Sequence, residues 1–284
     1  MVDASGSRSD IPTSTSRGQL AGHIHERLAQ EKALLTSEFA GSGLIRSCHI
    51  DDVLPDRVAR AIYDAFPDPE TMRFNKSLRE RKRVAAQMNL YDPILEEAIY
   101  AFQDPSIVAD IAEITGLSGL EPDHNLYAGG ISLMSQGHFL NPHIDNSHDK
   151  DRDRYRVLNL LYYVTPDWQR DFGGNLELWD DGPDGRPREI VSAFNRLVIM
   201  ATDRSSWHSV NRVRCDGRRC CVSNYYFSRQ SMEPEDYFHV TSFRGRPEQP
   251  LRDAVLRCDV AARMLVRKLF KKGVRENPHV YRRT

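Results

Sequence analysis

Between about residue 124 and residue 230, short apolar runs alternate with turn-forming residues, and no other feature of the 284-residue chain constrains its fold as strongly. The runs are rich in Val, Ile, Leu and Tyr, and each has the length of one strand. The sequence DGPDG at residues 181–185 predicts a turn between two of them. Eight strands at this spacing indicate an antiparallel sandwich or barrel. We expect the strands over residues 126–134, 137–143, 156–164, 175–180, 187–191, 195–201, 207–213 and 218–228.

Helical periodicity precedes this segment. A strand-like run over residues 44–50 interrupts it, and the polar, Arg-rich segment 76–84 predicts a loop. Apolar spacing, together with Pro and Gly residues that end the periodic stretches, predicts a helix that begins near residue 18 and helices over 51–65, 92–103 and 105–116.

A further helix is expected after the strands, over residues 249–272. Its apolar residues step by three and four, and this spacing predicts a stripe that packs on the sheet. The stripe consists of Leu251, Val255, Cys258, Ala262, Leu265 and Leu269. The same helix carries many basic residues, which are open to two interpretations, a polyanion-binding surface or a solvated helix back, and the second is favoured. They are Arg252, Arg257, Arg263, Arg267, Lys268, Lys271 and Lys272.

Charge and cysteine content exclude several classes of protein. Lys and Arg total 39 against 40 Asp and Glu, a net charge of −1 that argues against a dominant nucleic-acid-binding role. The five cysteines are an odd number without metal-type spacing, which argues against a disulfide framework or a structural zinc site. No apolar run approaches the roughly 18–20 residues of a membrane span. We therefore expect a cytoplasmic protein without a membrane partner.

The most informative polar residues are His143, Asp145 and His208. Residues two apart on an extended chain point to the same face, so His143 and Asp145 can reach one metal ion. His208 begins another predicted strand, and two His with one carboxylate suit non-haem Fe(II) oxygenases. The alternative is that Asp145 caps a turn and that His208 is an ordinary core or surface histidine.

The residues around these three resemble a known family. The run GHFLNPHID at 137–145 resembles the Gly-x-Phe-Leu-x-x-His-x-Asp segment of the prolyl 4-hydroxylase-like 2-oxoglutarate/Fe(II)-dependent dioxygenases. Further segments follow in the family's order: LYYV at 161–164, GGNLEL at 173–178, RLVIM at 196–200, WHSV at 207–210 and the run 219–227. The resemblance covers about 124–230 and implies a double-stranded β-helix, that is, a jelly-roll core.

This resemblance divides the chain into four parts. We expect a mainly β fold with flanking helices, and the helices before the core should support one of its sheets from outside. The expected parts are a disordered tail over 1–17, a helical support region over 18–123, the catalytic double-stranded β-helix over 124–231 and a C-terminal extension with a helix over 232–284.

The family also implies a basic residue that holds 2-oxoglutarate, and Arg218 and Arg219 both qualify. The usual spacing from His208 favours Arg218, whereas the spacing back from the aromatic end of the strand favours Arg219. Strand alternation places Arg219 on one face with Cys221, Ser223, Tyr225 and Phe227. We choose Arg219 and expect Ser223 to be a second donor to the carboxylate.

Two residues of the strand 156–164 complete the expected 2-oxoglutarate site. The family position of Tyr163 often donates its hydroxyl to the far carboxylate of 2-oxoglutarate, although Tyr163 could instead be a core aromatic residue. Asn159 shares its face and could donate to 2-oxoglutarate or to substrate. No catalytic residue beyond the metal ligands is expected.

The implied reaction uses Fe(II), 2-oxoglutarate and O2, hydroxylates an unactivated C–H bond and releases succinate and CO2. Related halogenases have a small residue where this chain has Asp145, so hydroxylation, desaturation or ring closure is favoured. We expect a small-molecule substrate: a free amino acid, a cyclitol or sugar, or a natural-product intermediate of secondary metabolism. The alternative is a peptidyl-prolyl or other protein hydroxylase. Two other classes of protein remain as alternatives. One is a cupin-like metal enzyme, and the other is a binding protein with a jelly-roll fold and no catalytic activity.

Overall fold

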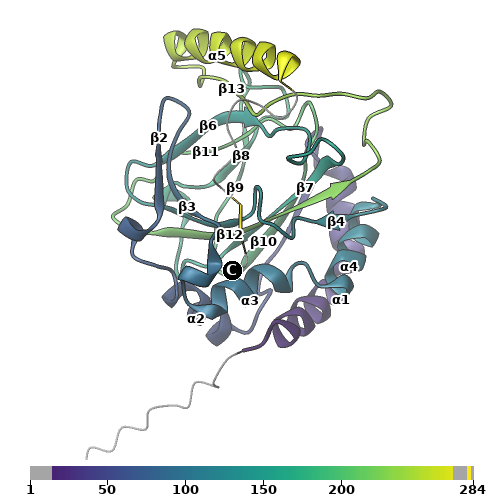
Figure 1. Cartoon of the computed structure of the whole chain (residues 1–284). Coiled ribbons are helices and arrows are strands. Elements are labelled where there is room, and N and C mark those ends of the chain that lie inside the picture. Colours follow the sequence, from purple (N-terminus) through teal and green to yellow (C-terminus); the bar gives the residue numbers. More distant parts are fainter. Residues whose placement is uncertain (1–14, 271–279, 283–284) are drawn as a thin grey trace, which may run out of the picture.

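The computed structural model describes residues 15–270 and 280–282. Within them, thirteen strands form one curled, hydrogen-bonded antiparallel sheet with helices at its lower side and one helix across its top (Figure 1). All eight predicted core strands form: β5 (Gly130–Met134), β6 (Phe139–Ile144), β7 (Tyr155–Tyr163), β8 (Leu176–Leu178), β9 (Arg188–Ile190), β10 (Arg196–Ala201), β11 (His208–Val210) and β12 (Arg219–Ser228). The predicted jelly-roll fold is confirmed.

Five further strands extend this core: β1 (Ser47–Ile50), β2 (Arg73–Lys76), β3 (Glu80–Ala85), β4 (Glu121–Pro122) and β13 (Ser242–Phe243). The main strand order is β1-β10-β7-β12-β5-β3-β6-β11-β8-β9. β3 pairs with both β5 and β6 and so joins the two halves of the curled sheet. This closure brings β6 and β11, the two strands with the candidate metal ligands, side by side.

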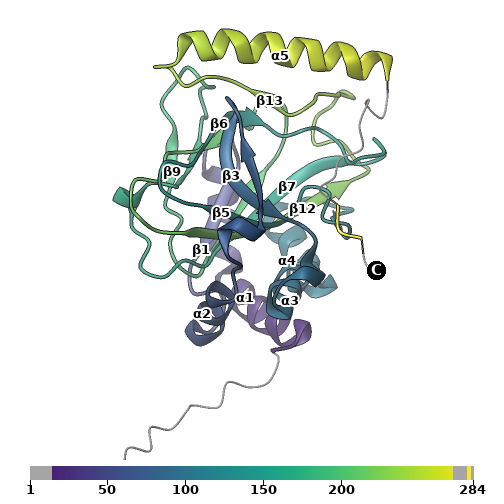
Figure 2. The same ribbon diagram turned by 60° about the vertical axis from the view of Figure 1, so that its left-hand side comes forward.

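The helices α1 (Arg17–Gly41), α2 (Asp56–Asp64), α3 (Pro93–Ala101) and α4 (Pro105–Thr115) form where apolar spacing predicts them, beneath the sheet (Figure 2). Short 3-10 turns cover Pro69–Thr71, Met88–Leu90 and Arg170–Phe172. Strand alternation divides β7 between two cores. Leu158, Leu160 and Tyr162 pack with the helices, whereas Tyr163 and Leu161 pack inside the curled sheet. The inner face of β7 does not pack on the helices and can therefore line a pocket.

The predicted tail over 1–17 lies outside the described residues as far as residue 14. Ser16 caps α1, accepting a hydrogen bond from the backbone N–H of Gln19, and Arg17 already belongs to the helix. None of the helices in residues 15–270 is long and apolar enough to cross a membrane.

The predicted loop over 76–84 is wrong, because this segment forms the turn and second strand of the hairpin β2–β3. Local composition disfavours a strand here, but β3 gains backbone partners from β5 and β6. The guanidinium groups of Arg81 and Arg83 lie 5.8 Å and 4.8 Å from the ring centre of Phe74, so their stems cover an aromatic surface. Tertiary pairing thus outweighs local propensity.

The C-terminal helix α5 (Pro250–Leu269) forms, but its predicted packing face is wrong. Leu251 is 85% exposed and Leu265 is 60% exposed, whereas Leu256, outside the predicted stripe, is 1% exposed. Leu256 packs in an apolar cluster with Met134, Leu140, Trp168, Val210, Val213 and Phe243. Asp253 and Asp259 of the helix pair with Arg244 and Arg79, and these ion pairs together with Leu256 determine which side faces the protein.

Candidate metal and cosubstrate site

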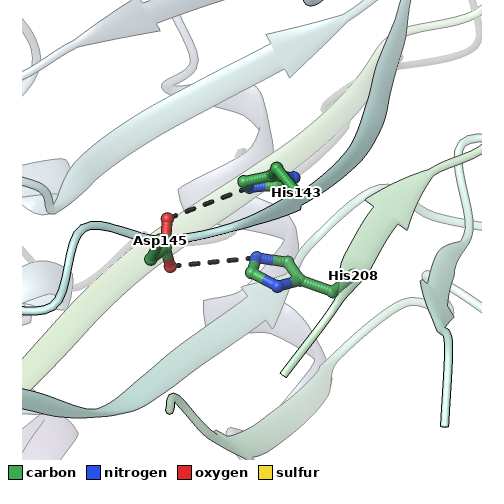
Figure 3. A group of neighbouring side chains, drawn as sticks. All are labelled: His143, Asp145 and His208. Carbon is green, nitrogen blue, oxygen red and sulfur yellow. Dashed lines mark ion pairs between the residues drawn. The ribbon is translucent and has the colours of Figure 1, made fainter. Parts of the chain in front are cut away.

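Three buried side chains meet at the centre of the curled sheet: His143 of β6, Asp145 just after it, and His208 at the start of β11 (Figure 3). His208 pairs with His143 in the strand register. The two Nε2 atoms of these histidines each lie 3.8 Å from a carboxylate oxygen of Asp145. One ligating atom from each residue lies within 4.8 Å of the others, so the group could hold one metal ion.

Backbone carbonyl groups orient both imidazole rings. Nδ1 of His143 lies 3.0 Å from the carbonyl oxygen of Asn141, and Nδ1 of His208 lies 2.8 Å from that of Ser206. Because a carbonyl oxygen only accepts hydrogen bonds, Nδ1 carries the proton in each ring. The lone pair of each Nε2 is therefore directed toward Asp145, as metal ligation requires.

The protonation states of the group also suit a metal. Burial lowers the pKa of His143 to about 3, so this ring is neutral at neutral pH. Burial raises the pKa of Asp145, but nearby positive charge, first that of Arg156, outweighs burial and lowers the pKa to about 2. Within the described part of the chain, Oδ2 of Asp145 is buried without a hydrogen-bond partner. The neutral imidazole of His143, the imidazole of His208 and one ionised carboxylate fit Fe(II) and leave coordination positions open.

A cavity of about 110 Å³ adjoins this group. Arg219, Ser223 and Asn159 line it, together with His143 and Asp145. The Arg219 side chain is buried; its Nε donates to Ser192 Oγ at 3.2 Å, and its guanidinium lies 4.6 Å from the ring centre of Tyr163. The structure thus brings three of the four predicted 2-oxoglutarate residues to the cavity wall and places Tyr163 against Arg219.

Arg219 begins β12, Arg218 directly precedes it, and the two side chains point to opposite sides of the sheet. Arg219 faces the cavity with Cys221, Ser223 and Tyr225. The guanidinium of Arg218 instead lies 5.5 Å from the ring centre of Tyr63, at the helical side of the sheet. Only Arg219 can therefore meet a ligand in the cavity from this position on the strand.

Sequence reasoning missed Arg156. Simple alternation along β7 would place it on the face opposite Asn159, which lines the cavity. The register of β7 with β12 shifts, however: Leu158 pairs with Tyr226, but Arg156 pairs with Phe227. The extra residue, Val157, forms a bulge that returns Arg156 to the inner face. Nη1 of Arg156 there lies 3.3 Å from Oδ1 of Asp145, and nothing in the local pattern indicates this contact.

Comparison with known proteins agrees with this geometry. Residues 129–227 match the family model of the 2OG-Fe(II) oxygenase superfamily. Prolyl 3-hydroxylase OGFOD1 of Mus musculus is 31% identical over 96 residues, which are 32% of this chain and only 17% of the mouse protein. Residues 129–227 are thus a 2OG-Fe(II) oxygenase domain. The family is named for Fe(II) and 2-oxoglutarate, and the group of His143, Asp145 and His208 is a candidate site for the iron.

Solved structures agree on the fold. A prolyl 4-hydroxylase from Phytophthora capsici has a TM-score of 0.55 at 17% identity and covers 94% of this chain and 84% of its own. A prolyl 4-hydroxylase from Pseudomonas putida has a TM-score of 0.51 at 18% identity, covering 70% of this chain and 100% of its own. At these identities the likeness establishes the shared jelly roll.

Proposed function

We propose that this chain hydroxylates a proline residue of a peptide or protein, with Fe(II) as cofactor and 2-oxoglutarate as cosubstrate. The proposed reaction class rests on one observation: the ligating atoms of His143, Asp145 and His208 lie within 4.8 Å of one another. These residues adjoin a cavity that Arg219 also lines. For the substrate, the 31% identical mouse relative is named a prolyl 3-hydroxylase. This likeness favours the protein substrate over the small molecule expected from the sequence.

The proposed ligands follow from the geometry. Nε2 of His143, Nε2 of His208 and the carboxylate of Asp145 would hold the iron. Arg219 would pair with the far carboxylate of 2-oxoglutarate through its planar guanidinium. When bound, iron supplies the chemistry that couples conversion of 2-oxoglutarate and O2 into succinate and CO2 to hydroxylation of a C–H bond.

The side chains of the protein prepare this chemistry. Arg156 favours the ionised form of Asp145, and the carbonyl groups of Asn141 and Ser206 hold the histidine rings in one tautomer. Ser223 and Asn159 can donate hydrogen bonds to a ligand in the cavity of about 110 Å³. The ring of Tyr163 packs against the guanidinium of Arg219.

The structure also provides space for a substrate. A second cavity of about 450 Å³ also contacts His143 and Asp145 and extends outward between the hairpin β2–β3 and α5. This volume lies within the range of ordinary ligand sites and is large enough for a proline residue. We further propose a cytoplasmic location, because all five cysteines are free thiols.

The test is a hydroxylation screen of the whole chain with Fe(II), 2-oxoglutarate and O2. Proline-containing peptides are compared with free proline, other amino acids, cyclitols and sugars, and both succinate and substrate mass are measured. We expect succinate release coupled to a mass gain of one oxygen atom on peptidyl proline, and no release by Asp145→Ala. Turnover of small molecules alone would contradict the proposed substrate.

A further inference from the structure

The second cavity, of about 450 Å³, is called the outer cavity below. It is unusually basic for a chain whose net charge is −1. Six cationic side chains line it against three acidic ones, Glu80, Asp145 and Asp149. Asp149 is engaged by Arg154, which lies outside the lining. We call the six cationic residues the basic mouth: Arg73, Arg79, Lys82, Arg156, Arg263 and Arg267. They come from three separate parts of the fold: the hairpin β2–β3, the strand β7 and the helix α5 (Figure 1).

Internal ion pairs neutralise only part of this charge. Lys82 lies 3.2 Å from Glu80, and Arg156 lies 3.3 Å from Asp145. Arg79 and Arg263 share the single carboxylate of Asp259. Burial, followed by the positive charge of Arg79, lowers the pKa of Arg263, so the two guanidinium groups repel one another. Arg73 and Arg267 form no ion pair with any acidic side chain of residues 15–270 and 280–282. An anion at this place would therefore relieve repulsion as well as gain hydrogen bonds.

Unused donors are present in the same wall. Nε of Arg156, Nη2 of Arg263 and Nε of Arg267 are buried, and in the described structure none of these atoms has a hydrogen-bond partner. Arg156 is itself 3% exposed and lines the cavity. A buried donor without a hydrogen-bond partner lowers the stability of the folded protein unless an acceptor reaches it. Carboxylates are such acceptors, and guanidinium groups bind them through two parallel hydrogen bonds.

We propose that the basic mouth binds an acidic segment of the peptide substrate, an inference that rests on the proposed peptide hydroxylation. Carboxylates that flank the target proline would be held by Arg263 and Arg267 of α5 and by Arg73 of β2. Because the cations come from three separate elements, an extended chain with several carboxylates can engage more of them than one small anion can.

A peptide fits these residues better than a nucleic acid. The ring of Phe238 in the cavity wall has the guanidinium of Arg152 at 3.6 Å from its centre, so that face is closed to a stacking base. The ring of Phe243 stacks on His143 with their centres 4.9 Å apart. The chain also lacks the overall basic excess that binding along a phosphate backbone requires.

The test measures binding separately from turnover. The protein is loaded with Mn(II), which does not support the reaction, and with 2-oxoglutarate. Fluorescence anisotropy then compares two labelled peptides with a central proline, one flanked by Asp and Glu, the other by Asn and Gln. We expect the acidic peptide to bind about tenfold more tightly at low salt and to lose that advantage at high salt.

The variant Arg263→Gln/Arg267→Gln should weaken binding of the acidic peptide about tenfold. Its matched control is Arg257→Gln/Lys268→Gln, which removes the same charge from exposed positions of α5 outside the cavity lining. Equal binding of both peptides, or equal loss in both double variants, would overturn the proposal. Tighter binding of a labelled single-stranded RNA that depends on Arg263 and Arg267 would also overturn it. If the acidic peptide binds as expected but its proline never gains oxygen under iron, the basic mouth stands and the proposed hydroxylation fails.

Discussion

Nη1 of Arg156 lies 3.3 Å from Oδ1 of Asp145, and both side chains are buried. The contact joins a candidate metal ligand to a cation in the wall of the outer cavity. Without a metal, Arg156 is the nearest full positive charge that compensates the buried carboxylate. With a divalent ion bound, that compensation is shared, so the contribution of Arg156 to stability depends on the metal.

Arg156→Ala should therefore destabilise the metal-free protein by about 3–5 kcal/mol, because it leaves a buried carboxylate unpaired. Mn(II) should recover most of this loss, so the rise in Tm on adding Mn(II) will be larger than in the wild type. The double variant Asp145→Asn/Arg156→Gln removes both charges and should cost clearly less than Arg156→Ala alone. Equal costs in urea unfolding of the two metal-free variants would show that the pair is not coupled.

The three candidate ligands predict a common loss of metal binding. His143→Ala, Asp145→Ala and His208→Ala should each abolish turnover and the stabilisation by Mn(II), which at about 100 times Kd amounts to about 2.7 kcal/mol in the wild type. Circular dichroism should show an unchanged fold, and His124→Ala, at an exposed position, should behave as wild type. A variant at Asp145 with full activity would rule this ligand set out.

Arg219 and Arg218 provide an internal control for cosubstrate binding. Arg219→Ala leaves the far carboxylate unpaired, at a cost of about 2–5 kcal/mol, or roughly 30-fold to several-thousand-fold weaker 2-oxoglutarate binding. Arg218→Ala should change binding by less than about fivefold, and Arg219→Lys should recover part of the loss, because Lys keeps the charge without the planar fork. The measurement is succinate release against 2-oxoglutarate concentration. If Arg218→Ala weakened 2-oxoglutarate binding more than Arg219→Ala, the assignment of Arg219 to the carboxylate would be wrong.

His138 predicts a pH dependence of stability. Burial, with smaller effects of Arg81 and Arg83, lowers the pKa of His138 from 6.5 to about 4, and its Nδ1 accepts a hydrogen bond from the backbone N–H of Ser135. A pKa lowered by folding means that the unfolded chain binds the proton more readily. This contribution is complete above pH 6.5 and is lost as the pH falls toward 4. His138→Gln should lose less stability over that interval in urea unfolding of the metal-free protein, and an unchanged slope would contradict the assignment.

The attachment of α5 depends on Leu256. Leu256→Ala should cost about 2–5 kcal/mol, because the side chain is 1% exposed within an apolar cluster. Amide hydrogen exchange in α5 should accelerate more than in the strands. Leu265→Ala, at a 60% exposed position of the same helix, should stay within about 0.5 kcal/mol of wild type. Similar effects of both variants would contradict the packing face that the structure shows.

The sequence by itself determined the parts of this protein that depend on local periodicity. The eight core strands follow from short apolar runs between turns, and each of them forms. Alternation also placed His143 beside Asp145 and set Arg219 apart from Arg218, because successive residues of a strand point to opposite faces whatever the strand's partner is. The pairing of His208 with His143 needs the closed jelly roll, and the resemblance to a known family indicated that closure.

Only the tertiary structure decided features that depend on a partner element. Arg156 turns inward because β7 has one residue more than β12 at the bulge, and a register shift is a property of two strands together. Arg-rich β3 is a strand because β5 and β6 offer it backbone hydrogen bonds. The residues of α5 determine its helical periodicity. Its contacts with Arg79, with Arg244 and with the apolar cluster around Leu256 determine which side of the helix is buried. Local chemistry sets which faces an element has, and the free energy of contact with the rest of the chain selects the one that is buried.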